Sequence, residues 1–122
     1  MLSSIGYAIT GLTGALLLLI GARALLAPKA AATSYGIPEV AGLEPYMTIK
    51  GGRDLGLGAI TVALMITAST HALGWFMLAG TVIPLIDGIN VLRSGGPKAI
   101  AFGVHHATAV VMLIGAGVLL AA

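Results

Sequence analysis

Apolar residues dominate the chain in four long runs, which short polar segments separate. Each run is close to the length of about 20 residues that a helix needs to cross a bilayer. We therefore predict an all-α fold, an integral membrane four-helix bundle with both termini on the same side. The predicted helices cover about residues 4–26, 46–69, 73–92 and 99–121, within a single transmembrane domain of residues 1–122.

The segments between these helices differ in charge, which predicts an orientation. Loops that carry Lys and Arg stay in the cytoplasm, so we expect residues 27–45 and 93–98 there and both termini outside the cell membrane. The 27–45 loop is long enough to lie in the membrane interface as a short helix or lid. The basic residues of the two loops and their borders are Arg23, Lys29, Arg93 and Lys98.

Composition agrees with a membrane protein and excludes other classes. The chain is 58% hydrophobic and 8% charged, whereas soluble domains carry about 25% charged residues. The net charge of +2 is too small for a nucleic-acid partner, and a chain without cysteine has no thiolate metal site. We expect the lipid bilayer as partner, and neither a metal nor a cofactor.

Polar side chains gather at one depth of the predicted bundle. Four of them share one face of the second helix, two lie near the inner end of the third, and two histidines lie early in the fourth. All are within about 12 Å of the inner ends of their helices. Charges at this depth are costly and indicate function by default. The residues are Tyr46, Lys50, Arg53, Asp54, Asp87, Asn90, His105 and His106.

Several of these residues also have a purely structural interpretation. Lys50 can extend its amine to the lipid headgroups. Arg53, paired with Asp54 or Asp87, can fix the register of two helices without any catalytic role. Asn90 can hydrogen-bond between helices.

His105 and His106 point about 100° apart on an α-helix, so we expect at most one to face the bundle centre. The other would cap a backbone carbonyl or meet headgroups. A metal or haem site would need histidines on facing helices, which this adjacent pair does not provide.

Small residues and one proline shape the second and third helices. Gly52 and Gly56 form a GxxxG motif, which indicates close helix packing within the chain or between two copies in a homodimer. Pro84 stands one turn before Asp87 and is expected to kink the third helix and free a carbonyl near the polar layer.

Three sequence segments resemble a known family. They are YMTIKGGRDLGLG in the second helix, YGIP shortly before it, and Asp87-Gly88 followed by Val91-Leu92-Arg93. With an early histidine in the last helix, they resemble a family of small bacterial and fungal four-helix membrane proteins, the domain of unknown function 4267. The similarity covers nearly the whole chain.

The resemblance implies an architecture and a set of polar positions. It places the characteristic residues of the family on Arg53, Asp54, Asp87 and His106, and thus favours His106 over His105 as the inward-facing histidine. It also implies a link to epoxide opening, through fungal relatives connected with polyketide pathways.

Two carboxyl groups joined by an arginine are suited to acid/base catalysis, because the arginine can hold them in different protonation states. We predict a membrane-embedded enzyme that opens an epoxide of a lipophilic small molecule, by hydrolysis or cyclisation, near the cytoplasmic leaflet. A histidine as the base is an alternative. An accessory membrane subunit and a small transporter are alternatives of other classes. The predicted catalytic residues are Asp54, Asp87, Arg53 and His106, and the predicted positioning residues are Asn90, Tyr46, Lys50 and His105.

Overall fold

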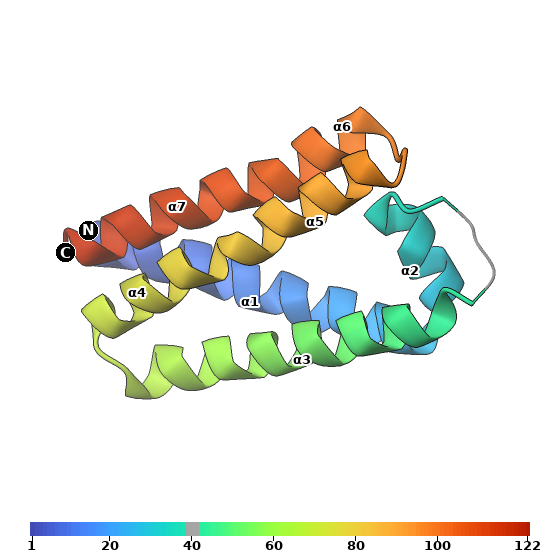
Figure 1. Cartoon of the computed structure of the whole chain (residues 1–122). Helices are drawn as coiled ribbons and strands as arrows, with labels where there is room; N and C mark the ends of the chain where they lie inside the picture. The colour runs from blue at the N-terminus through green and yellow to red at the C-terminus, as the bar shows by residue number, and fades with distance from the viewer. Residues whose placement is uncertain (39–41) are drawn as a thin grey trace.

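The computed structural model of the chain describes residues 1–38 and 42–122, which are all-α and contain no strand. Figure 1 shows long helices that lie side by side. The elements are α1 (Leu2–Leu26), α2 (Pro28–Tyr35), α3 (Glu44–Thr67), α4 (Thr70–Gly80), α5 (Val82–Arg93), α6 (Lys98–Ile100), the π-helix η1 (Ala101–His106) and α7 (Ala107–Leu120).

The predicted number of four helices is wrong, because the described chain has five. Four are the expected long rods, counting Thr70–Arg93 and Lys98–Leu120 as one rod each. The fifth is α2, inside the predicted loop 27–45. Pro28 starts α2 at a position where the missing N–H costs nothing, and Gly36 ends it with a φ of 95°. The expectation of a short helix in this loop is therefore confirmed.

Three helices of the described chain are long and apolar enough to cross a membrane, and they are Leu2–Leu26, Thr70–Arg93 and Lys98–Leu120. α3 is similar in length, at 24 residues. It is not among the three, because its first half carries the charged residues of the predicted polar layer.

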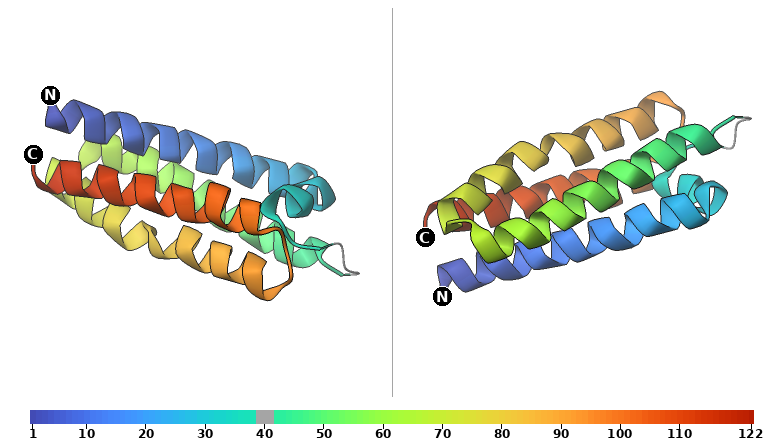
Figure 2. Two further views of the ribbon diagram at one scale, coloured as in Figure 1. Left: turned by 90° about the horizontal axis from the view of Figure 1, so that it is seen from above. Right: turned by 90° about the horizontal axis from the view of Figure 1, so that it is seen from below.

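Glycines allow α1 and α3 to pack backbone against backbone. A Cβ atom added to Gly21 would lie 2.6 Å from the backbone nitrogen of Leu55, and one added to Gly51 would lie 2.9 Å from the carbonyl oxygen of Gly21. Figure 2 shows the two helices side by side and antiparallel. The predicted GxxxG motif is not part of this contact, since a Cβ atom added to Gly52 or Gly56 would meet nothing within 4 Å in the described part of the chain. A homodimer through these two glycines stays a prediction.

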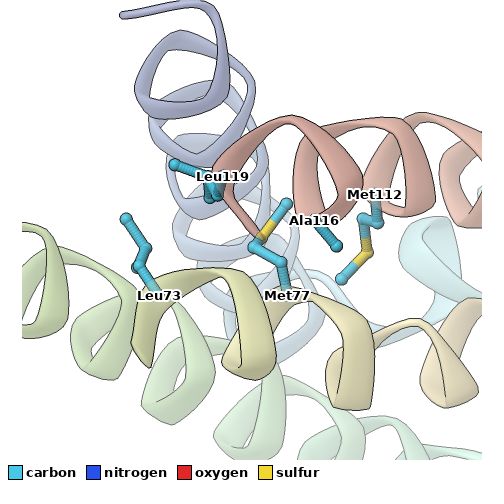
Figure 3. Close-up of a cluster of buried hydrophobic side chains, with 5 residues drawn as sticks. All are labelled: Leu73, Met77, Met112, Ala116 and Leu119. Carbon is cyan, nitrogen blue, oxygen red and sulfur yellow. The ribbon is translucent and has the colours of Figure 1, made fainter. Parts of the chain in front are cut away.

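Both termini lie at the same end of the bundle (Figure 1). Near this end α4 packs on α7 around a cluster of buried side chains, shown in Figure 3. α1 joins the cluster closely, because a Cβ atom on Gly6 would lie 2.6 Å from Leu119. The cluster consists of Leu73, Met77, Met112, Ala116 and Leu119.

The helices diverge toward the other end of the bundle. There α3 packs mainly on α1, whereas α5 packs on η1, and α2 packs against α1 and α3 (Figure 1). The third rod is interrupted at Thr81, between α4 and α5. Pro84 has no N–H to offer the carbonyl of Gly80, so the α-helical bond at this point is missing. The helix is thus interrupted three residues before Pro84, and the kink itself stays a prediction.

Candidate functional site

A cleft of about 600 Å³ lies among α1, α3, α4–α5 and η1–α7. Its polar groups are gathered where the helices diverge, next to α2. The predicted convergence of ionisable groups from several helices is therefore confirmed. The ionisable lining residues are Arg23, Tyr35, Lys50, Arg53, Asp54, Asp87 and His105.

Arg53 links two carboxylates that belong to different helices. Its Nε donates to Oδ1 of Asp54 at 2.9 Å, and its Nη2 donates to Oδ2 of Asp87 at 3.2 Å. Asp54 precedes Leu55 on α3, whereas Asp87 lies on α5. The sequence is compatible with either residue as the partner of Arg53, and the structure pairs the arginine with both. The side chain of Asp54 is 2% exposed and that of Asp87 is 13% exposed.

Lys50 adds a second cation to this group. Its Nζ donates to Oδ2 of Asp54, one helical turn away, and lies 5.1 Å from the centre of the Tyr35 ring. The expectation that this amine extends to the headgroups is therefore wrong, because the buried carboxylate of Asp54 attracts it into the cleft. Two cations and two carboxylates thus form a cluster that is balanced in charge.

The two carboxylates differ in the number of cations that they contact. Among residues 1–38 and 42–122, Asp54 accepts from both Lys50 and Arg53, whereas Arg53 is the one cation that contacts Asp87. Positive neighbours stabilise the ionised form of a carboxyl group. The two carboxylates of the cluster therefore lie in unequal electrostatic surroundings.

Tyr35 connects α2 to this cluster. Its hydroxyl donates to the backbone carbonyl of Asp87 at 3.4 Å and accepts from the Asn90 amide at 3.4 Å. Its own carbonyl oxygen lies 2.9 Å from Nε2 of His105. Burial disfavours the phenolate and raises the pKa of Tyr35 to about 12, so the side chain is a neutral phenol.

The sequence predicts a positioning role for a different tyrosine, Tyr46. Tyr46 is 70% exposed and does not line the cleft. Its spacing from Lys50 and Arg53 is that of residues on one face of a helix. It lies in the first turn of α3, however, and does not contribute to the cluster. In the sequence, Tyr35 stands out only as the first residue of the YGIP segment. The signal that could have found it is Gly36, which ends a short alanine-rich helix directly after this tyrosine.

The two histidines lie in the π-helix η1, a conformation that is common at functional sites. His105 is buried and lines the cleft, with its ring 4.6 Å from that of Tyr35. His106 packs on Gly88, and its ring lies 5.1 Å from that of Phe102. The resemblance favoured His106 as the inward-facing histidine, and this is wrong. The π-helical turn contains an extra residue, so α-helical angles did not apply.

The remainder of the cleft presents an apolar surface, although three threonines line it. Each of their hydroxyls donates to the carbonyl four residues earlier in its own helix, at 2.7–2.9 Å. This bond removes the polar atom from the cleft surface. The lining threonines are Thr13, Thr61 and Thr108.

Among the described residues, no three side chains of His, Asp or Glu are placed to hold a metal ion together. A lipophilic molecule in the cleft would meet a cluster of charges at one end and only apolar surface at the other.

Comparison with known proteins gives a family and no characterised relative. No curated protein and no solved structure matches the chain. The family model described as the domain of unknown function DUF4267 matches residues 14–120. The match spans both carboxylates, the arginine between them and both histidines, and the chain belongs to this family.

Proposed function

We propose that the protein is a membrane-embedded acid/base enzyme that opens an epoxide of a lipophilic small molecule. One observation carries the proposal. Asp54 and Asp87, from different helices, share the guanidinium of Arg53 at the polar end of an otherwise apolar cleft. The apolar remainder suits a lipophilic substrate, and the shared guanidinium suits two carboxyl groups in different protonation states.

The proposed reaction assigns one step to each carboxyl group. Protonated Asp87 donates its proton to the epoxide oxygen as the carbon–oxygen bond breaks. Ionised Asp54 accepts a proton from water as the water oxygen bonds to the epoxide carbon. A hydroxyl of the substrate in place of water gives a cyclic ether instead of a diol. The proton then returns from Asp54 to Asp87 through a water molecule, which restores the starting state.

The remaining polar residues support this chemistry. Arg53 stabilises the carboxylate that forms on Asp87, and Lys50 donates a hydrogen bond to the Asp54 carboxylate. Tyr35 and Asn90 hold the backbone beside Asp87 in place and present a phenol to the attacking group. His105 is the second candidate for the base, because histidine titrates near neutral pH and this one lines the cleft.

The proposal includes a place in the cell membrane. α3 lies antiparallel to α1 along its length and would cross the bilayer with it, because its charges are paired inside the bundle. The charged cluster then lies near the cytoplasmic leaflet. The segments 27–45 and 93–98 face the cytoplasm, since they carry basic residues, and both termini lie outside.

Turnover by the reconstituted protein tests the function. Protein in lipid nanodiscs is incubated with an epoxidised monoterpene and an epoxidised fatty acid in ¹⁸O-labelled water. The proposal predicts a diol with one labelled oxygen, or an unlabelled cyclic ether from a substrate with an internal hydroxyl. Consumption of neither probe, at protein concentrations that give full binding, would contradict it.

The rival functions give different results in the same preparation. A small transporter would exchange a labelled solute in proteoliposome counterflow without product. For an accessory subunit, neither Asp54→Asn nor Asp87→Asn protein would accumulate in the membrane, because the ion pairs would serve the fold alone.

A further inference from the structure

Arg23 is the third cation that lines the cleft, and it differs from the other two. Lys50 and Arg53 both pair with carboxylates. Among the described residues, no carboxylate lies within ion-pair distance of the Arg23 guanidinium, and the residue is exposed. An exposed guanidinium on the wall of an apolar cleft is a receptor for an anion, because its planar fork binds a carboxylate through two parallel hydrogen bonds.

The packing of α1 on α3 sets the level of Arg23 relative to the charged cluster. A Cβ atom on Gly51 would lie 3.0 Å from the Cβ of Ala24, so these two residues are side by side. Arg23 precedes Ala24, and Asp54 follows Gly51 by three residues. Because α1 and α3 are antiparallel, both residues lie on the same side of this contact, at ~1.5 Å for Arg23 and ~4.5 Å for Asp54, so their backbones are ~3 Å apart along the bundle axis. Arg23 lies on the side of the cluster that is closer to α2.

An apolar stripe continues from Arg23 along the same face of α1. Leu12, Leu16 and Ile20 precede it at intervals of three and four residues, and all three line the cleft and are exposed. Val104 and Val111 line the cleft from η1 and α7 and are also exposed. The cleft therefore opens between these two walls, on a side that faces lipid when the bundle lies in a bilayer.

We propose that this opening admits an amphipathic substrate with an anionic carboxylate head, which Arg23 binds. The apolar tail of the substrate then lies along α1 and α7, toward Met77 and Met112, whose flexible side chains adapt to tails of different shape. The inference rests on the proposed function for the chemistry, because it places a reactive group near the carboxylate, beside Asp54 and Asp87. Carboxylate recognition itself can be measured without any reaction.

Equilibrium binding of two unreactive ligands tests the inference. Radiolabelled palmitic acid and its methyl ester share a tail and differ in the charge of the head. Binding is measured in phosphatidylcholine nanodiscs, which carry no net charge, in mildly alkaline buffer where the acid is ionised. The expected result is a preference of at least about fivefold for the acid, the magnitude of one partly exposed charge-assisted hydrogen-bond pair.

Two variants locate this preference. Arg23→Gln should bind the acid and the ester equally and keep the wild-type affinity for the ester. Arg93→Gln removes an exposed basic residue outside the cleft lining, at the same end of the bundle, and should keep the full preference. Equal binding of acid and ester by the wild-type protein would overturn the inference. So would an unchanged preference in Arg23→Gln.

Two further measurements distinguish this inference from a site for lipid headgroups and from the proposed reaction. Phosphatidylglycerol added to the nanodiscs should not displace the acid; displacement would show a site for lipid headgroups and overturn the inference. The second measurement is epoxide turnover in the same nanodiscs. If the preference is present while no epoxide is ever consumed, the proposed reaction fails and the carboxylate site stands. If epoxides are consumed without a preference for the acid, the carboxylate site fails alone.

Discussion

Nη2 of Arg53 lies 3.2 Å from Oδ2 of Asp87, and this ion pair joins α3 to α5 across the cleft. The two helices pack mainly on other neighbours at this level, α3 on α1 and α5 on η1. The pair therefore contributes both to the geometry of the polar cluster and to the closure of the bundle. These two contributions can be measured separately.

A double-mutant cycle measures the structural contribution of the pair. We expect Arg53→Gln and Asp87→Asn each to lower the free energy of unfolding in detergent, with a coupling energy of about 1–2 kcal/mol between them. The value is lower than for a fully buried pair because the Arg53 side chain is 38% exposed. If the effects of the two single variants sum to that of the double variant within about 0.5 kcal/mol, the pair contributes nothing to stability.

Lys50→Met should destabilise the protein more than Lys29→Met does. The first change leaves the buried Asp54 carboxylate with one cation instead of two, and we expect a cost of about 2–3 kcal/mol in thermal or denaturant unfolding. Lys29 serves as the control, because its pair with Glu44 is 3.7 Å long and exposed. Its removal should cost less than about 1 kcal/mol. Equal costs would mean that Asp54 does not depend on Lys50.

Substitution by alanine should have opposite effects on stability at two adjacent glycines. The Cβ atom of Gly51→Ala would lie 2.9 Å from the Gly21 carbonyl oxygen, so α1 and α3 must separate, at a cost of about 1–3 kcal/mol. Gly52→Ala meets nothing within 4 Å and gains helix propensity. Unfolding of the monomer in detergent should therefore show Gly51→Ala as destabilised and Gly52→Ala as unchanged or more stable. The reverse order would contradict the packing of α1 on α3.

Alkaline pH should weaken the fold through Tyr35. Its pKa is raised to about 12 in the folded protein, mainly by burial, against 10.0 for an ordinary tyrosine. Between these values the unfolded chain loses a proton that the folded protein keeps, so stability falls as pH rises from about 10 to 12 and is unaffected below 10. The difference in phenolate absorbance between the wild type and Tyr35→Phe should titrate near pH 12. A midpoint near 10 would show that this phenol is solvated.

The long helices were predictable from sequence, because the length of an apolar run and the charges at its ends define a span. The helix expected at 4–26 is Leu2–Leu26, and the one expected at 99–121 corresponds to Lys98–Leu120. The convergence of Asp54, Asp87 and Arg53 followed from their depth in antiparallel helices. Depth depends only on helical rise, which side-chain packing does not alter.

The missed features depend on contacts between distant segments. The alanine-rich α2 is too short to give a membrane signal. Its Tyr35 contacts Asp87 only in the folded protein, because the two residues are 52 positions apart in the sequence. The π-helical turn that directs His105 into the cleft has no sequence pattern of its own. Tyr46 lies outside the cleft lining, which its sequence position does not indicate, because equal spacing along a helix does not show where the neighbouring helices end.

The central claim is that Asp87 and Asp54 transfer protons during epoxide opening. Its most direct test is single-turnover diol formation by Asp87→Asn and Asp54→Asn, compared with Glu44→Gln. The control changes an exposed carboxylate on α3 in the same way. We predict that each aspartate variant folds, binds the epoxide and forms diol at least about 100-fold more slowly, since an amide cannot act as acid or base. Glu44→Gln should keep the wild-type rate. Diol formation by folded Asp87→Asn at the wild-type rate would contradict the account.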